Sequence, residues 1–493
     1  MGIIKRQGIQ NSIISYAGVF IGYVNLMVLF PRFLSVEQVG LTRVLPAIAI
    51  VLAQLSALGF GSAGIKFFPF FRDKVRRHHN FLAFLLGVPL LGFSIVIGLY
   101  YLFQPQIIGY YAKEAPLLRQ YSYYIGPLSF FTLFFTLFNS YLTSLYKTVI
   151  PSLTKDFLLR VGVSLCVLLY AYDFINFEVF LLLFIGVNAG ITLVLLVYII
   201  WLKQFHLSPK LSALSKQPIR PMFQYGLYAF LGNISSTIIT VIDSIMITHY
   251  NGLGDAGIYT TATYVASIIL IAGSSIYKIA SPKIADYWKN NDLKTMQVLY
   301  QQVTRINLVV GCLLFIGIWA NVHNLLALLP KAYSSGKYVI FFVCAARLFD
   351  LASGINGYIL LTSPRYRYDL IFNILLASLT VIANPYFIKN YGINGAGFVF
   401  FVVYGVINTM RLACVYYFYK MQPFDKTSLQ IIMLALLAYV VGWQLPFMYH
   451  TLVDIAIRSV LITVIYGVGV LNLNLAPEMT DKVVTQIRKR LNF

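Results

Sequence analysis

The chain has 493 residues, of which 59% are hydrophobic and 11% are charged, and its mean hydropathy is +0.77. Soluble globular chains carry about 25% charged residues, so this composition excludes a large soluble catalytic domain and indicates an integral membrane protein. The formal net charge is +21. Nucleic acid is excluded as a partner, because the chain lacks the soluble basic module that binding nucleic acid requires.

Apolar stretches long enough to cross a bilayer, about 20 residues each, recur along the whole chain. They predict an all-α polytopic fold with fourteen transmembrane helices, at residues 9–30, 43–68, 80–103, 121–146, 153–172, 178–202, 222–249, 256–280, 300–323, 337–361, 369–388, 394–419, 428–446 and 452–474. No small-residue cleavage site follows the first stretch, so we expect it to be a retained helix rather than a signal peptide.

The basic residues predict how the helices are oriented. With both termini in the cytoplasm, 25 Lys and Arg residues fall on cytoplasmic connections and 7 on the opposite side. This bias fits a multi-pass membrane protein with both termini in the cytoplasm, and it explains most of the net charge without an anionic partner beyond lipid headgroups. Residues 477–493 alternate apolar and basic side chains, which predicts either an amphipathic helix on the inner leaflet or a solvated tail.

An internal repeat has a constant offset of 217 residues. It pairs Gly40 with Gly257, Lys66 with Lys283, Tyr121 with Tyr338, Asn139 with Asn356, and Tyr141 with Tyr358. An even shift of six helices predicts two parallel six-helix lobes. The expected organisation is an N-lobe at 1–202, a basic cytoplasmic loop at 203–221, a C-lobe at 222–420, two further helices within 421–476 and the basic tail at 477–493.

Local motifs resemble those of a known family. The segments Pro31–Leu41 and Leu58–Phe67 resemble the opening of bacterial polysaccharide transporters, the O-antigen flippases of the multidrug/oligosaccharidyl-lipid/polysaccharide exporter superfamily; 243–247 and 257–262 are similar to its second-lobe counterpart. The resemblance implies a MATE-like pair of lobes around a central cavity, with spans one and seven at their interface. The chain departs from the family at Lys66, where arginine is frequent, and at Ser244, where a basic residue is frequent.

Charges within the spans are the candidate functional residues, since a charge at membrane depth usually faces a cavity or a partner. Arg347 lies near mid-bilayer, with Asp350 on the same helical face. Either Arg347 binds a substrate phosphate bidentately while Asp350 orients it, or the two form a structural ion pair.

The other basic candidates lie nearer the membrane surface. Arg160 and Arg411, about two turns from the cytoplasmic ends of their spans, either line the cavity or extend to the headgroups. Lys66 and Lys283 either attract anionic headgroups at the inner entrance or are plain cytoplasmic anchors. We expect Arg305 at the interface and Asp454 with Arg458 as a local helix pair.

Asp243 on the seventh span has no basic residue three or four positions away. A carboxylate in an apolar site exchanges protons nearer neutral pH, so we predict that Asp243, and secondarily Asp350, couples transport to H⁺ or Na⁺. The alternative is a pair between Asp243 and an arginine of another span. The four cysteines lie in apolar stretches and lack metal-ligand spacing, so neither a metal nor another cofactor is expected.

These observations favour a non-enzymatic flippase that moves an anionic polyprenyl-diphosphate-linked oligosaccharide across the cytoplasmic membrane, with membrane lipids and other polysaccharide assembly proteins as partners. The alternatives are a peptidoglycan-precursor flippase, a drug or cation antiporter of the same fold, and a membrane glycan polymerase, ligase or glycosyltransferase. The embedded charges are mainly arginines, which favours an anionic substrate over a cationic drug. The scattered external carboxylates show no catalytic pairing.

Overall fold

The computed structural model describes residues 2–72, 80–111, 114–206, 219–446 and 450–477. Within these ranges every regular element is helical, which confirms the all-α prediction. The chain divides into two compact units, Met1–Thr260 and Thr261–Phe493. The lobe boundaries expected from the sequence stay predictions; most of the 203–221 loop and of the 477–493 tail lies outside the described residues.

The first unit begins with a nearly continuous helical segment and ends in the first turns of α12. Its elements are α1 (Gly2–Val24), the π-helix η1 (Asn25–Leu29), α2 (Phe30–Phe33), α3 (Val36–Ala57), α4 (Phe60–Phe71), α5 (Phe81–Tyr111), α6 (Pro116–Tyr121), the 3₁₀ turn η3 (Ser122–Tyr124), α7 (Ile125–Ser144), α8 (Val149–Ser152), the π-helix η4 (Leu153–Leu158), α9 (Leu159–Ala171), α10 (Phe177–Trp201) and α11 (Ile219–Asn251).

Local sequence sets the limits of α3. Ser35 and Gln38 form a capping box, in which the Ser35 hydroxyl accepts from the Gln38 amide while the Gln38 side chain accepts from the Ser35 amide. This arrangement satisfies two amides that a helix start leaves free. Leu58 and Gly59 then take positive φ angles, 48° and 74°, so the predicted span 43–68 is two helices, α3 and α4, joined at a left-handed corner.

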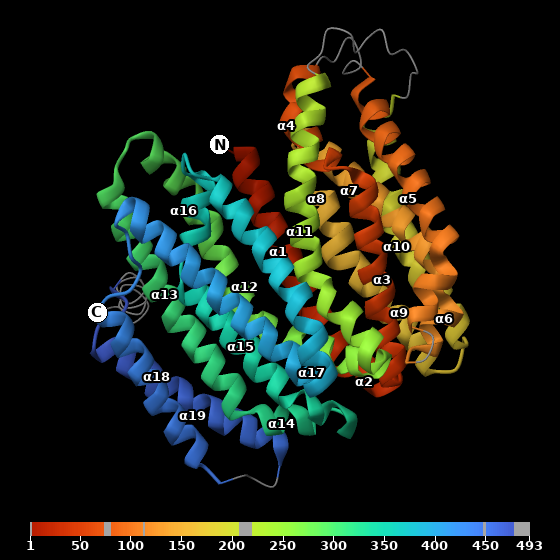
Figure 1. Cartoon of the computed structure of the whole chain (residues 1–493). Coiled ribbons are helices and arrows are strands. Elements are labelled where there is room, and N and C mark those ends of the chain that lie inside the picture. Colours follow the sequence, from red (N-terminus) through yellow and green to blue (C-terminus); the bar gives the residue numbers. More distant parts are fainter. Residues whose placement is uncertain (1, 73–79, 112–113, 207–218, 447–449, 478–493) are drawn as a thin grey trace. The chain divides into compact units, whose positions relative to one another are not determined.

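The second unit contains the rest of α12 (Leu253–Lys289) and the remaining helices. These are α13 (Leu293–Ala320), α14 (Val322–Ala327), the 3₁₀ helix η6 (Lys331–Gly336), α15 (Lys337–Ala352), α16 (Asn356–Thr362), α17 (Arg367–Tyr419), α18 (Lys426–Gln444) and α19 (Thr451–Asn472). The α18 and α19 helices pack together against α13 around the buried side chains of Ile431, Ile462 and Tyr466 (Figure 1).

Two helices of the second unit are broken. α17 changes direction at Gly392, where φ is 59° and ψ is −144°, a conformation that needs glycine. The α15 and α16 helices meet at a bend of 53° around Gly354, which has a φ of 66°.

The described residues contain eleven helices long and apolar enough to cross a membrane, or up to twelve if the bent pair α15 and α16 is one span. Each of the fourteen predicted stretches coincides with helical segments, and α17 carries two of them on either side of Gly392. The chain is therefore an integral membrane protein with many spans. The count of fourteen stays a prediction.

Candidate functional site

Arg305, Arg411 and Arg458 contact carboxylates. Arg458 pairs with Asp454 at 3.0 Å, with both side chains only 1% exposed, and this confirms the predicted local pair. Arg305, expected at the interface, is half-buried and pairs with Asp425 at 2.6 Å. These pairs neutralise charges that would be costly in an apolar surrounding.

Arg411 is the third paired arginine. Its Nη2 donates to Asp369 Oδ1 at 3.0 Å and to Asn373 Oδ1 at 2.9 Å, and the Asn373 amide donates to Asp369 at 3.1 Å. All three residues belong to α17, and Asp369 and Asn373 lie one turn apart before the break at Gly392. The contact thus joins the two halves of this helix. Whether Arg411 also meets substrate stays a prediction.

Arg347 and Asp350 on α15 face a row of side chains on α17 spaced four residues apart. The Arg347 guanidinium carbon lies 4.9 Å from the ring centroids of both Phe400 and Tyr404. Asp350 accepts a hydrogen bond from Asn408 at 3.0 Å. The guanidinium of Arg347 therefore lies within cation–π distance of two aromatic rings of α17.

Asn408 connects Asp350 to the repeat-related asparagine. The Asn356 amide approaches Asn408 Oδ1 at 3.5 Å, and both asparagines are almost fully buried. Asn356 also accepts from the amide of Gly357 at 2.6 Å. The chain Asn356, Asn408 and Asp350 is a buried polar network, a type of arrangement that holds helices in one register.

Asp243 on α11 is 7% exposed and accepts a hydrogen bond from the Tyr259 hydroxyl at 2.6 Å. Tyr259, on α12, is itself 3% exposed. This hydrogen bond ties α11 to α12. Tyr259 lies in the motif at 257–262, but its contact with Asp243 was not predicted from the sequence. The coupling role of Asp243 stays a prediction.

The helical run that carries Arg160 is longer than predicted, and the depth of Arg160 in the membrane stays a prediction. The predicted span began at residue 153, but the helix starts at Val149, so Arg160 lies midway along the continuous helical run 149–171. Its Nη1 atom is buried and meets no hydrogen-bond partner among the described residues. Asp156, one turn earlier, accepts from Ser15 at 2.7 Å.

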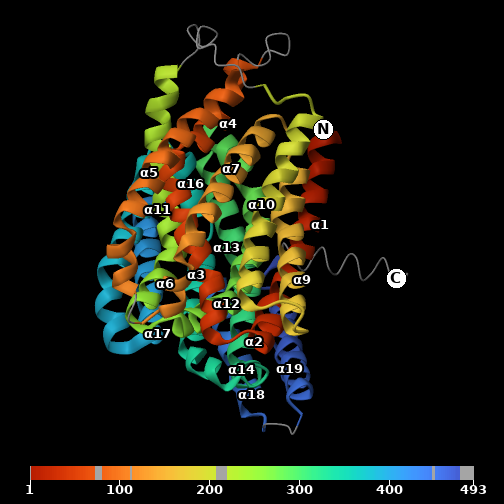
Figure 2. The same ribbon diagram turned by 90° about the vertical axis from the view of Figure 1, so that its right-hand side faces the viewer.

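The surroundings of Arg160 form a polar seam between α1 and the helical run 149–171, which lie side by side (Figure 2). Asn25, in the π-helix η1, donates to the Arg160 carbonyl at 3.0 Å and accepts from the Ser164 hydroxyl at 2.6 Å. At Gly18 a Cβ would lie 1.9 Å from the Asp156 carbonyl oxygen, so the two backbones touch. Both π-helices border the seam, and π-helices are frequent at functional sites.

Most residues of this seam were not predicted from the sequence. Asp156, Ser15, Asn25 and Ser164 were not candidates, because small polar residues inside a span usually serve packing. The available signal was Asp156 one helical turn before Arg160, within a segment that already contained a candidate charge.

The two repeat-related lysines lie at exposed positions. Lys66 on α4 places Nζ 3.7 Å from the ring centroid of Tyr225 on α11, which is a cation–π contact. Lys283 on α12 is also exposed. Their proposed meeting with anionic headgroups stays a prediction.

Two repeat-related glycines meet where α3 crosses the start of α12. A Cβ on Gly40 would lie 1.9 Å from the Leu253 carbonyl oxygen, and one on Gly257 would lie 2.5 Å from that of Val36. The offset of 217 that relates Gly40 to Gly257 also relates Val36 to Leu253. The contact is therefore reciprocal, which supports the internal repeat.

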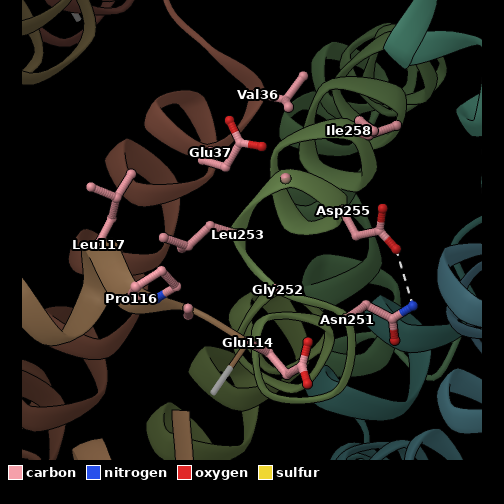
Figure 3. A pocket seen from close by; sticks show the side chains of 12 residues that line it. Val36, Glu37, Glu114, Pro116, Leu117, Asn251, Gly252, Leu253, Asp255 and Ile258 are labelled. Carbon is pink, nitrogen blue, oxygen red and sulfur yellow. Dashed lines mark hydrogen bonds between the residues drawn. The ribbon is translucent and has the colours of Figure 1, made fainter. Parts of the chain in front are cut away.

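Next to this crossing lies a cavity of about 310 Å³. Figure 3 shows Glu37, Glu114 and Asp255 around it, with the Asn251 amide donating to Asp255 at 3.0 Å. Within the described residues no group of three or more His, Cys, Asp or Glu side chains is arranged to hold a metal ion.

An all-helical chain with many apolar spans, with charged side chains between its helices, defines a polytopic membrane protein. The model of the polysaccharide biosynthesis protein family matches residues 4–288. The chain belongs to this family of membrane transport proteins, which confirms the resemblance seen in its sequence.

Solved structures share the fold. A lipid II flippase MurJ in an inward closed conformation superposes with a TM-score of 0.76 at 15% identity, covering 94% of this chain and 98% of that one. An inward-facing multidrug resistance MATE family transporter of the MOP superfamily gives 0.56 at 12% identity, covering 84% and 94%. The Vibrio cholerae MATE transporter VcmN, in the bent form, gives 0.50 at 9% identity, covering 85% and 98%. No curated protein sequence matches the chain.

Proposed function

We propose that this protein is a flippase that carries a polyprenyl-diphosphate-linked oligosaccharide, such as an O-antigen, capsule or exopolysaccharide repeat unit, across the bacterial cytoplasmic membrane. Transport proceeds by alternating access coupled to H⁺ or Na⁺. A diphosphate crosses about 30 Å of hydrocarbon only at great cost, so the protein supplies cationic contacts for the headgroup while the polyprenyl chain stays in the bilayer. The chain's family and its MurJ-like fold support a transport role rather than an enzymatic one.

The observation that carries the proposal is Arg160. A guanidinium midway along a helical run, with a buried nitrogen that meets no hydrogen-bond partner among the described residues, has donors to offer to an anion. Arginine binds phosphate through two parallel N–H bonds. The proposal assigns Arg160 the first phosphate contact, with Arg347, Arg411, Lys66 and Lys283 as further cationic contacts, and it assigns ion coupling to Asp243 and Asp350.

Transport by purified protein in liposomes tests this assignment, with a panel of diphosphate-linked oligosaccharides as substrates. Arg160→Gln removes hydrogen bonds to a charged group worth about 1.5–3 kcal/mol, so the flipping rate should fall about 10- to 150-fold. Arg160→Lys should retain part of it, because lysine keeps the charge and loses the planar fork. The control Lys389→Gln removes an exposed charge and should flip normally. Wild-type rates in Arg160→Gln would refute the assignment to Arg160.

A second candidate is a flippase for a peptidoglycan-precursor lipid. It is favoured by the TM-score of 0.76 to a lipid II flippase over nearly the full length of both chains. The same liposome panel separates the two when lipid II is included, since the preferred substrate competes with the others for flipping. Failure of the wild type to flip any diphosphate-linked lipid would refute both candidates.

A further inference from the structure

An aromatic groove lies at the corner where α17 turns. Its volume is about 430 Å³, and it is lined by Phe342 of α15 and by Phe387, Tyr391, Asn394, Gly395 and Phe398 of α17. Gly395 permits the tight corner, because a Cβ there would lie 2.1 Å from the Phe387 carbonyl oxygen.

The rings of the groove form a connected wall. Phe398 lies 5.5 Å from both Phe342 and Phe387, measured between ring centroids, and Phe387 lies 6.1 Å from Tyr391. Tyr391 is 60% exposed and Phe398 37% exposed. Parts of the Tyr391 and Phe398 side chains are therefore accessible to a ligand in the groove.

Asn394 is the polar group of this groove. Its Oδ1 atom is buried and meets no hydrogen-bond partner in the described part of the chain. Burying an amide group without a partner costs about 1–3 kcal/mol, a cost that a ligand hydroxyl donating to Oδ1 would remove. A pure hydrocarbon chain would leave the amide unsatisfied and so fits this site poorly.

The groove lies beside the connection that the bias of basic residues assigns to the exterior, next to Lys389 and Gly392. An occupant therefore combines hydroxyl donors with apolar C–H faces at the height of the membrane surface. A pyranose ring has both features, since its C–H face packs on aromatic rings and its hydroxyls reach polar groups at the edge.

We infer that this groove binds a sugar residue at the outer face of the membrane. Tyr391 and Phe398 pack against the pyranose face, and Asn394 accepts a bond from a ring hydroxyl. The inference rests on the proposed function in so far as the sugar belongs to the flipped glycan, and it adds a contact for the glycan that is separate from the phosphate contact at Arg160.

Saturation-transfer NMR on the full chain in phosphatidylcholine nanodiscs tests the groove, with maltose as the probe because a free disaccharide does not partition into the bilayer. Saturation should pass to the C–H protons of maltose in the wild type. Asn394→Leu removes a hydrogen bond of about 1 kcal/mol, so the signal should fall about five-fold. Tyr391→Ala should remove it, whereas Tyr391→Phe, which keeps the ring, should retain it.

Phe174→Ala is the matched control, since Phe174 is an aromatic residue 75% exposed on another connection of the predicted outer side. Equal maltose signals in the wild type and in Tyr391→Ala and Asn394→Leu, or none in the wild type, would overturn the inference. Native mass spectra that show phospholipid bound to the wild type but not to Tyr391→Ala would also overturn the inference, because the occupant would then be a bilayer lipid. The maltose measurement involves no transport. A wild type that binds maltose but flips no lipid refutes only the proposed function. A wild type that flips a lipid-linked oligosaccharide but does not bind maltose refutes only the sugar site in this groove.

Discussion

The contact between Arg411 and Asp369 gives a quantitative prediction about stability. Arg411→Gln removes the guanidinium that donates to both Asp369 and Asn373, at 3.0 and 2.9 Å. The paired side chains are 13% and 14% exposed, so the carboxylate left behind is poorly hydrated. An uncompensated charge in such surroundings is far more costly than the loss of the attraction itself.

The magnitude follows from this burial. Breaking a fully buried pair costs about 3–5 kcal/mol, and the residual exposure of this pair places the expected loss near the lower end, about 3 kcal/mol. If the second unit unfolds on its own, the midpoint of thermal unfolding should fall by about 6–12 °C. Asp369→Asn should cost a comparable amount, because it leaves the arginine uncompensated.

A double-mutant cycle read by thermal unfolding in detergent micelles measures the interaction. The double variant Arg411→Gln with Asp369→Asn contains neither charge, so it should be more stable than the sum of the single losses predicts, by about 1–3 kcal/mol. Arg160→Gln serves as a control, since it removes an arginine without stranding a paired carboxylate and should leave the midpoint unchanged. Additive single effects in the cycle would refute the claim that the pair joins the two halves of α17.

Three further predictions follow from other contacts. Gly40→Ala forces a Cβ to within 1.9 Å of the Leu253 carbonyl oxygen and should destabilise the protein by about 1–3 kcal/mol, whereas Gly87→Ala, with open space at its Cβ, should not; equal midpoints of thermal unfolding would contradict this. Burial opposes the charge of Asp425, but hydrogen bonds from the serine three residues later and from its paired arginine hold the pKa of Asp425 below its usual value. The ionised Asp425 carboxylate therefore stabilises the protein above its unfolded-state pKa, and this stabilisation is lost as pH falls. The midpoint of thermal unfolding should drop more steeply towards acid pH in the wild type than in Asp425→Asn. Parallel curves of midpoint against pH would contradict this prediction. Asp243→Asn should still bind lipid but lose the dependence of flipping on an imposed pH or sodium gradient; full dependence would remove Asp243 from the coupling step.

Hydropathy predicted the positions of the helices, because a long apolar stretch that crosses a bilayer satisfies its backbone hydrogen bonds internally by forming an α-helix. It did not place the breaks within them. The corner at Leu58 and Gly59 interrupts an apolar stretch, and nothing in composition separates α3 from α4. At Gly392 the prediction fared better, because Lys389 and the polar residues near it already divided the two stretches.

Charged candidates could be chosen from the sequence, but their partners could not. The pair between Asp454 and Arg458 was predictable because both residues lie on one helix at a spacing of four. Asp369 and Arg411 are 42 residues apart, and only the turn of α17 brings them together. The start of the helical run that carries Arg160 was placed at residue 153, four residues after the observed start at Val149.

The crossing of Gly40 and Gly257 restricts how this chain can change. Each missing Cβ would meet the main chain of the opposite helix rather than a side chain, and no substitution can shorten a main chain. No substitution at one of these glycines can therefore relieve the clash caused by a larger residue at the other. Random mutagenesis should yield no suppressor pairs between the two positions. If the two halves arose by duplication of one ancestral segment, both copies had to keep glycine at this position, even where the rest of their sequences diverged.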